Sequence, residues 1–441
     1  MATFADAGTA RLWALRAMAL TATVAAIAWH FAVAARPASV PGVPVLRVVE
    51  AGGPVPVLVV PNRPGPNLVH IGATVPASDV PASGATVPAG GVPAGGVAVG
   101  GVAVGGVAVG GVAVGTDRGR LFPVLGRPGA SGGWAVVDLP AGRARLWIGH
   151  GGHVTELAVD TGGGATPAPD LTGPDGPECA AAALGRLAAG VAGPMAACPA
   201  DGLTAGDAVA LRGTIRFLAQ RGQRAITLVA DSSPRSAAGA AIIRTESAKA
   251  GIAVGRYGDD VTSSHIEWGN STSSPAEPPA EPPAGPPAGP PAEPPAEPPA
   301  EPPAEPYVVV SGWATADAAL RGLAADRANA SGGAYLAPWL LHAPLLDGPV
   351  ARLVALRYDP TDEPPQAYLA ALSRAFRGEP ASGTGYAAWL AARGSSTDGP
   401  VRLYAAARLA VPGSVGHGHA DAGWLPGGRL TAVTTPLDGG Q

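Results

Sequence analysis

The chain has 441 residues, too many for one hydrophobic core and enough for two or three domains. Gly and Pro account for 64 and 49 residues and are concentrated in two low-complexity tracts, so two modest folded domains are the better expectation. The formal net charge is −4, and neither a basic stripe nor an acidic tail is present, which argues against nucleic acid as a partner.

An apolar segment at residues 17–35 follows Arg11 and Arg16. It is about as long as a helix that crosses a bilayer, and the positive charges before it favour an inside N-terminus and an outside chain. We predict that residues 1–36 are a retained anchor. Two alternatives stay open: a signal peptide cleaved near Ala32-Val33-Ala34, and a buried helix of a soluble domain. The expected location is therefore the cell membrane, with one N-terminal span and the bulk of the chain extracytoplasmic.

Residues 37–162 contain short apolar runs separated by Pro and Gly, a pattern typical of an all-β, immunoglobulin-like sandwich. The predicted strands are Val45 to Val49, Val55 to Val60, Asn67 to Ile71, Gly119 to Val124, Trp134 to Leu139, Ala144 to Ile148 and Val154 to Val159. Residues 74–115 interrupt the pattern and end in four copies of GVAVG. Because glycine at this density holds no fixed register, we predict a low-complexity insertion in a surface loop, with an adhesive or self-associating loop as the alternative.

Two segments of this region, PNRPGPNLVHI and GGWAVVDLPAGRARLWI, resemble the small β-sandwich segment attached to some bacterial copper-resistance membrane proteins. The resemblance implies an extracytoplasmic sandwich and carries no metal site with it. The imidazoles of His70, His150 and His153 suit copper or zinc, but no Met or Cys cluster accompanies them. We therefore expect ordinary strand and loop histidines here.

After a linker at residues 163–177, helical and strand-like patterns alternate over residues 178–435, which predicts an α/β domain with an open parallel sheet. The predicted strands are Ala225 to Ala230, Ile252 to Val254, Tyr307 to Val310, Tyr335 to Leu341, Val350 to Tyr358 and Leu403 to Leu409. A PPAE-type repeat at residues 275–306 interrupts the domain, and its proline density predicts a solvated polyproline II excursion. Residues 436–441 form a tail.

Cys179 and Cys198 are the two cysteines, and their separation fits neither a CxxC redox pair nor a zinc site. Two interpretations stay open. The pair forms a disulfide in an exported domain, or both thiols are small apolar side chains buried among alanines.

The order of elements over residues 200–435 resembles that of type I periplasmic binding proteins, the branched-chain amino-acid receptors of ABC importers. The segments that carry the resemblance are, in order, AITLVAD, AGIAV, VVVSGWATADAALRGL, GGAYLAPWLL, ALRYDP, PASGTGYAAW and WLPGGRLT. It implies that Asp231, Trp313 and Trp339 lie at the carboxyl ends of strands and face a ligand cleft, with Tyr386 as a fourth ligand-binding candidate. An open α/β sheet places a ligand there on general grounds as well. Because Pro338-Trp339 stands where such a receptor has an acidic partner for the ammonium of its substrate, we do not expect an amino acid.

No nucleophile elbow, HExxH motif or Walker loop stands in a suitable local structure, so we expect no catalysis and no cofactor. His417 and His419 with Asp421 are the densest ligand-like group, but two histidines alone bind metal weakly. The expected function is recognition of a small-molecule ligand or an envelope protein partner by a membrane-anchored, extracytoplasmic chain. The alternatives are a cell-envelope scaffold with a degenerate receptor lobe and a metal-handling envelope protein.

Overall fold

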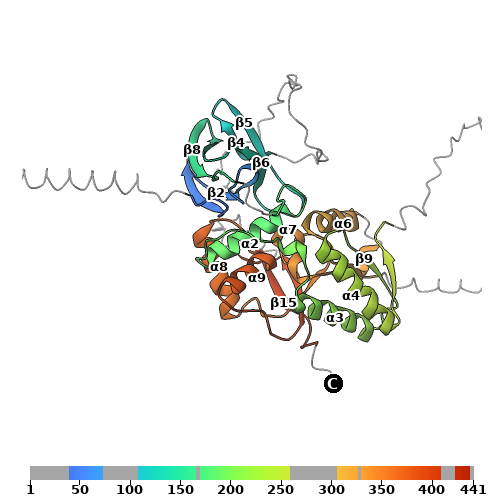
Figure 1. Ribbon diagram of the computed structural model, residues 1–441. Helices are drawn as coiled ribbons and strands as arrows, with labels where there is room; N and C mark the ends of the chain where they lie inside the picture. Colours follow the sequence, from blue (N-terminus) through green and yellow to red (C-terminus); the bar gives the residue numbers. More distant parts are fainter. Residues whose placement is uncertain are drawn as a thin grey trace, which may run out of the picture.

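The computed structural model describes residues 39–72, 108–164, 169–258, 305–325, 329–408 and 423–437. They form an eight-stranded sheet, here called the β region, and a seven-stranded sheet with helices, the α/β region (Figure 1). The predicted anchor, most of the Pro-rich tract and the group of His417, His419 and Asp421 lie outside these residues. Within the described ranges, no helix has the length and apolarity needed to cross a membrane.

The β region contains all seven predicted strands and one more. Its strands are β1 (Val45–Glu50), β2 (Pro54–Val60), β3 (Gly65–Ile71), β4 (Ala108–Asp117), β5 (Arg120–Leu125), β6 (Gly133–Leu139), β7 (Arg143–His150) and β8 (His153–Asp160). They pair in the order β1-β2-β3-β6-β5-β4-β7-β8, and every pair is antiparallel. The predicted two-sheet sandwich is therefore wrong. One continuous sheet curls until β1 contacts β8, and it encloses a core of its own.

The last copy of the GVAVG repeat is part of this sheet, which corrects the predicted insertion at residues 74–115. Residues 108–115 lie in β4, between β5 and β7 in the sheet. Val112 and Val114 are buried in the β-region core, while the alternation is interrupted by register shifts against β5. This strand was not predicted because the glycine pairs interrupt the alternation of apolar and polar residues that is typical of a strand. In the structure, β-bulges accommodate the extra residues.

A buried asparagine holds the turn between β2 and β3. The Oδ1 atom of Asn67 accepts hydrogen bonds from the backbone N–H groups of Asn62, at 2.8 Å, and Arg63, at 3.1 Å. Its Nδ2 atom donates to the carbonyl oxygens of Arg63 and Gly65. The run of prolines leaves few backbone donors, so one side chain supplies the hydrogen bonds that would otherwise come from a strand partner.

The sheet of the α/β region is mixed. Its strands are β9 (Ala225–Val229), β10 (Ala253–Arg256), β11 (Tyr307–Val309), β12 (Ala334–Leu336), β13 (Arg352–Leu356), β14 (Arg402–Arg408) and β15 (Gly428–Ala432). In the order β10-β9-β11-β12-β13-β14-β15, the first five strands are parallel, whereas β14 and β15 are antiparallel. The predicted parallel sheet is thus correct for β9 to β13 and wrong for β14, and β15 was not predicted as a strand. The residues from Ala337 to Leu341, predicted as part of a strand, form a turn beyond β12 that contains η3 (Pro338–Leu340).

The helices begin at recognisable caps. They are α2 (Gly176–Ala188), α3 (Ala205–Gln220), α4 (Pro234–Ala250), α6 (Trp313–Ala325), α7 (Ala343–Leu346), α8 (Glu363–Ala375) and α9 (Gly383–Ala392), with short turns η1 (Pro199–Asp201) and η2 (Asn329–Gly332). The side chains of Thr204, Ser233 and Ser382 accept a backbone N–H in the first turn of α3, α4 and α9. These three caps define the residues at which α3, α4 and α9 begin.

Side chains of the β region contribute to two cores, its own and that of the α/β region. In β2 and β3 the side chains alternate: Val59 and Val69 face the β-region core, whereas Leu58, Val60 and Leu68 belong to the core of the α/β region. The strands are buried on both faces, which explains the continuous apolar run PVPVLVV in β2. A polar contact crosses the same interface: His70 Nε2 lies 2.8 Å from Glu379 Oε2, and Ser131 donates a hydrogen bond to Glu379 Oε1.

Candidate functional site

The strand order of the α/β region reverses direction at β9. After β9 the chain crosses to β10 on one side, returns to β11 on the other side, and then continues through β12 and β13. Right-handed crossovers in opposite directions place α4 and α6 on opposite faces of the sheet. A crevice opens at the carboxyl ends of strands at such a switch point, and ligands bind there in open α/β sheets. A ligand site is therefore expected at the loops after β9 and β11.

In this chain, α2 and two turns close that crevice. The Asp231 carboxylate, after β9, accepts the backbone N–H of Gly312, after β11, at 2.5 Å. Asp175, at the start of α2, lies so close that a Cβ atom on Gly312 would overlap its carboxylate. Burial raises the pKa of Asp175 to about 6, and the neighbouring carboxylates of Glu178 and Asp231 add to the rise. The switch point is thus occupied by the protein itself.

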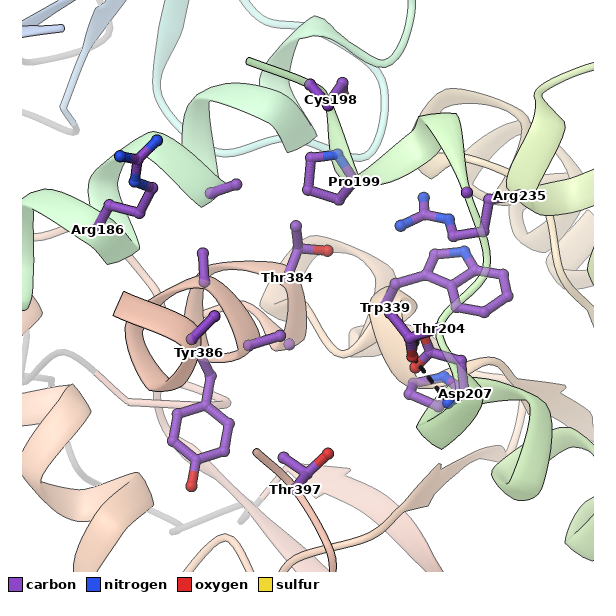
Figure 2. Close-up of a pocket in the computed structure, with 18 of the residues that line it drawn as sticks. Arg186, Cys198, Pro199, Thr204, Asp207, Arg235, Trp339, Thr384, Tyr386 and Thr397 are labelled. Carbon is purple, nitrogen blue, oxygen red and sulfur yellow. Dashed lines mark hydrogen bonds between the residues drawn. The ribbon is translucent and has the colours of Figure 1, made fainter. Parts of the chain in front are cut away.

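The open space lies beside the switch point, over β12 and β13. A cleft of about 780 Å³ is bounded by the starts of α3 and α4, by η3, by α9 and by the segment that leads from α2 to α3 (Figure 2). Its walls are mostly apolar, with alanines on α2 and α9, Pro199, Trp339 and Tyr386. A volume of this size and a lining of this kind are typical of small-molecule sites.

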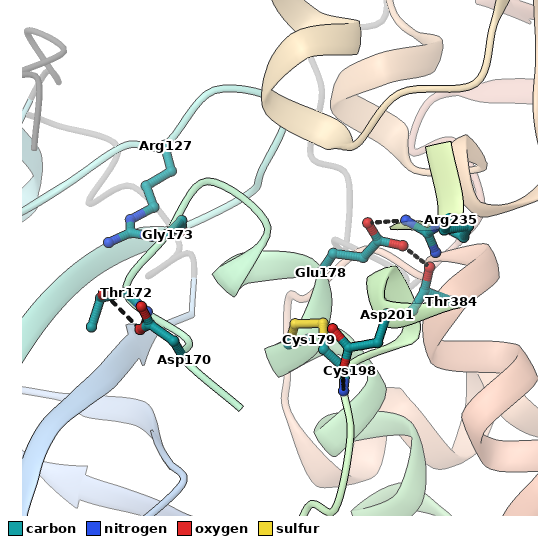
Figure 3. The surroundings of a disulfide bond; sticks show 10 residues. All are labelled: Arg127, Asp170, Thr172, Gly173, Glu178, Cys179, Cys198, Asp201, Arg235 and Thr384. Carbon is teal, nitrogen blue, oxygen red and sulfur yellow. Dashed lines mark hydrogen bonds and ion pairs between the residues drawn. A yellow bond between two sulfur atoms is a disulfide. The ribbon is translucent and has the colours of Figure 1, made fainter. Parts of the chain in front are cut away.

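A disulfide fixes one wall of the cleft. Cys179 in α2 is bonded to Cys198, with 5.2 Å between their Cα atoms, and Cys198 is followed at once by Pro199 of the cleft lining (Figure 3). The Oδ2 atom of Asp201 accepts the Cys198 N–H at 2.7 Å and closes η1. On the other side of α2, Gly185 packs directly on the backbone of Gly385 in α9. The cleft wall is thereby tied to α2 at two places.

A buried ion pair stands at the centre of the lining. Arg235, in the first turn of α4 and 3% exposed, donates from Nη2 to Glu178 Oε2 at 2.6 Å. The other oxygen of Glu178, which is fully buried, accepts the hydroxyl of Thr384 in the first turn of α9 at 2.7 Å. The guanidinium also lies over the ring of Trp339, 4.5 Å from its centroid. Arg235 and Thr384 face the cleft, whereas Glu178 lies behind them.

A second carboxylate faces the cleft from α3. The Oδ2 atom of Asp207 accepts the Thr204 hydroxyl at 2.7 Å, and Thr204 in turn accepts the Asp207 N–H at 3.1 Å (Figure 2). Burial raises the pKa of Asp207, although the hydrogen bond from Thr204 and the charge of Arg235 oppose the rise. Among the described residues, no basic group lies within ion-pair distance of this carboxylate.

Aromatic rings hold Tyr386 in place at the far side of the cleft. The Tyr386 ring lies 4.6 Å from that of Tyr358 and 5.7 Å from that of Trp424, measured between centroids. Burial raises the pKa of Tyr386 to about 12 and that of Tyr358 further, so both phenols are neutral hydrogen-bonding groups. The Tyr358 hydroxyl is buried and has no hydrogen-bond partner within the described part of the chain.

The four predicted ligand-binding residues divide into two pairs. Trp339 and Tyr386 line the cleft, so the structure brings these two together. Asp231 and Trp313 do not line it. Asp231 is used in the turn before α4, where it also accepts the N–H and hydroxyl of Ser233, and Trp313 is buried with its Nε1–H donated to the Trp339 carbonyl. Its indole is stacked on His342 at 4.2 Å.

Three lining residues were missed in the sequence. Arg235 follows the β9 turn directly and could have been found as a first-turn side chain at a strand carboxyl end. Asp207 stands three residues after Thr204, a spacing typical of a helix cap, and this pattern does not tell which way the free carboxylate oxygen faces. Thr384 lacks any local signal, since its partner Glu178 is 206 residues away.

The histidines considered for metal binding have other contacts. His70 is buried against Glu379, and His150 and His153 face each other as neighbours across β7 and β8, with His150 Nδ1 at 3.1 Å from the Ala51 carbonyl oxygen. Within the described ranges, no group of three His, Cys, Asp or Glu side chains is arranged to hold a metal ion.

Comparisons with known proteins give a limited similarity. No protein-family model matches the chain, and no curated protein matches it either. Two solved structures are similar: an ABC transporter substrate-binding protein from Desulfitobacterium hafniense, with a TM-score of 0.25, and such a protein from the same organism in complex with Leu, with a TM-score of 0.23. Both are 14% identical to this chain and cover 42% of it, and the chain spans about half the length of each, 47% and 48%. These TM-scores are too low to support a function, which is argued below from the cleft alone.

Proposed function

We propose that this chain binds a small solute in the cleft between α3, α4 and α9 and performs no chemistry on it. The observation that carries the proposal is the cleft itself: about 780 Å³ of open space at the carboxyl ends of β12 and β13, with apolar walls and a few converging polar groups. The charges that face it are held by structural partners, as Arg235 is by Glu178, rather than arranged as an acid and a base around a reacting atom.

The proposal includes an extracytoplasmic location with one N-terminal membrane span. Its support is the apolar segment at residues 17–35 behind Arg11 and Arg16, together with the disulfide between Cys179 and Cys198, since disulfides persist in oxidising compartments. Both features suit a protein that binds solutes at the outer face of a membrane.

A thermal-shift and calorimetry screen of the full-length chain tests the proposal. The compounds are amino acids, sugars, aromatic acids and aromatic amines. At least one class should raise the melting temperature and bind with one-to-one stoichiometry, because a ligand that binds only the folded state stabilises it.

Two variants show whether the binding uses the cleft. Ala387→Trp places an indole in the cleft from the exposed side of α9, and it should abolish the shift. Ala238→Trp, at an exposed position of α4 outside the cleft lining, is the matched control and should keep it. Silence of the wild-type chain toward every compound, or a shift that survives in Ala387→Trp, would contradict the proposal.

A further inference from the structure

The anion-binding groups of the cleft already bind an anion of the protein itself, which lies behind the lining. Arg235 and Thr384 stand in the first turns of α4 and α9, where side chains and backbone N–H groups commonly bind a ligand carboxylate or phosphate. In this chain both donate to the carboxylate of Glu178, at 2.6 and 2.7 Å (Figure 3). A ligand anion would have to displace a fully buried carboxylate from two short hydrogen bonds.

The charges left over favour the opposite sign. With the pair of Arg235 and Glu178 neutralised, the charged groups lining the cleft are Arg186, Asp201 and Asp207. Arg186 donates to the Pro194 carbonyl and Asp201 accepts the Cys198 N–H, so both are engaged in holding the cleft wall. Asp207 has the Thr204 hydroxyl as partner but no positive charge within ion-pair distance among the described residues. Burial raises its pKa, and a cation bound beside it would oppose that rise.

The apolar lining indicates the chemistry of the uncharged part of a ligand. Trp339 and Tyr386 both line the cleft, and in Figure 2 Tyr386 is drawn on the opposite side of the open space from Trp339, Asp207 and Thr204. Both are buried aromatic side chains, 3% and 2% exposed, and Tyr386 is held by neighbouring rings. Aromatic faces attract cations as well as apolar groups.

We propose that the solute is an amphipathic organic cation without a carboxylate or phosphate, with its ammonium at Asp207 and its apolar body between Trp339 and Tyr386. This inference rests on the proposed function and names the class of solute. Glu178 serves as the fixed internal anion of the site and makes it selective against anionic solutes.

Matched triplets of compounds test the inference on the full-length chain. An amine, an alcohol and a carboxylate on each of a phenyl, a cyclohexyl and an indole skeleton are titrated by calorimetry. At least one amine should bind, and its alcohol and carboxylate should bind at least about tenfold more weakly, since a hydrogen-bonded ion pair is lost. Asp207→Asn should weaken binding of the amine about tenfold or more, whereas Asp138→Asn, at an exposed position of β6 outside the cleft lining, should leave it within about twofold.

The results separate the inference from the proposed function. If an alcohol or a carboxylate binds as tightly as its amine, or if Asp207→Asn leaves the amine unchanged, the inference is wrong while a solute-binding cleft stands. If no compound of the nine or of the wider screen binds the wild-type chain, the proposed function fails, and the inference fails with it.

A second variant tests the role of Glu178 independently of any solute. In Glu178→Ala, Arg235 and Thr384 lose their carboxylate, and the space left behind them adjoins the cleft. Acetate should then bind and raise the melting temperature of the variant at constant ionic strength, and it should not do so for the wild-type chain or for Asp138→Asn. A variant that folds but gains nothing from acetate would contradict the assignment. If Glu178→Ala does not fold, Glu178→Gln is used, and it should remain unresponsive to acetate while the wild-type preference for amines is lost.

Discussion

The β region and the α/β region differ in how complete their cores are. The core of the β region consists of residues from its own strands and of Ala51 in the turn between β1 and β2. The core of the α/β region includes Leu58, Val60, Leu68 and Trp134 from the outer face of the β sheet. The contribution is one-sided: the β region supplies side chains to the core of the α/β region, which contains the cleft, and the α/β region supplies none to the core of the β region.

Two ion pairs, one in each region, differ in burial. The described ion pair within the β sheet, Arg145 with Glu156, is exposed on both sides at 69% and 47%. In the α/β region, Arg235 and Glu178 are 3% and 0% exposed. Water screens the first pair and not the second, so the same chemical pair contributes little in one region and is essential in the other. Four predictions sharpen this comparison.

The largest effect is expected from removing one partner of the buried pair. Arg235→Met leaves the Glu178 carboxylate buried without its cation and should lower the free energy of unfolding by about 3–5 kcal/mol. Arg145→Met in the β region should change it by less than about 0.5 kcal/mol. Urea unfolding of both variants provides the measurement. Equal effects of the two substitutions would show that burial does not distinguish the pairs.

Two adjacent residues of β3 test the one-sided core. Leu68→Ala should cost about 3 kcal/mol and should reduce the amide hydrogen-exchange protection of α2, because Leu68 packs in the α/β core. Val69→Ala should instead affect mainly the strands of the β region, where Val69 is buried. Hydrogen exchange followed by mass spectrometry resolves the two. Loss of protection in the same segments for both variants would contradict the division into two cores.

A buried histidine gives the α/β region a pH-dependent stability. Burial lowers the pKa of His342 to about 4 from 6.5, the charges of Glu379 and His70 act on it in opposite directions, and its Nε2 atom has no partner among the described residues. Because the unfolded chain binds the proton first, stability should fall by at most about 3 kcal/mol as the pH drops from 6.5 toward 4. His342→Phe keeps a ring against Trp313 and should remove this slope between pH 6.5 and 5. Below about pH 4.5 the lowered pKa of Glu379 adds a further loss of stability. An unchanged slope in the variant would rule out His342 as its source.

The smallest effect concerns Asp175 beside the switch point. Its pKa is raised to about 6, so ionisation of the folded chain costs stability as the pH rises from about 4 through 6. Asp175→Asn should stabilise the chain at pH 8 by about 1 kcal/mol after screening by solvent is allowed for, and by nothing at pH 4. Thermal unfolding at the two pH values measures the difference. A gain of the same size at both pH values would trace the effect to packing rather than to charge.

The sequence predicted most of the elements because each depends on a local period. The strand predicted from Ala225 to Ala230, for example, is a mostly apolar run and is found as β9 (Ala225–Val229). The pairing of the strands could not be predicted from the sequence. The curled sheet of the β region depends on β4, and the valines of β4 stand among glycines that are equally typical of a loop.

The site was predictable only in part for the same reason. Trp339 follows a strand and was expected at the cleft, where it lies. Trp313 follows a strand equally well, but its ring turns into the core and stacks on His342. Glu178 and Arg235, which set the charge of the site, are 57 residues apart and meet only in the folded chain. Periodicity locates the elements, and long-range pairing decides which side chains reach the cleft.

The most direct measurement is a crystal structure of the full-length chain with the tightest-binding amine from the triplet panel. We predict ligand density between Trp339 and Tyr386, with the ammonium nitrogen within hydrogen-bond distance of Asp207 and with Glu178 still bound to Arg235. A ligand outside this cleft, or a ligand anion seated on Arg235 in place of Glu178, would contradict the account.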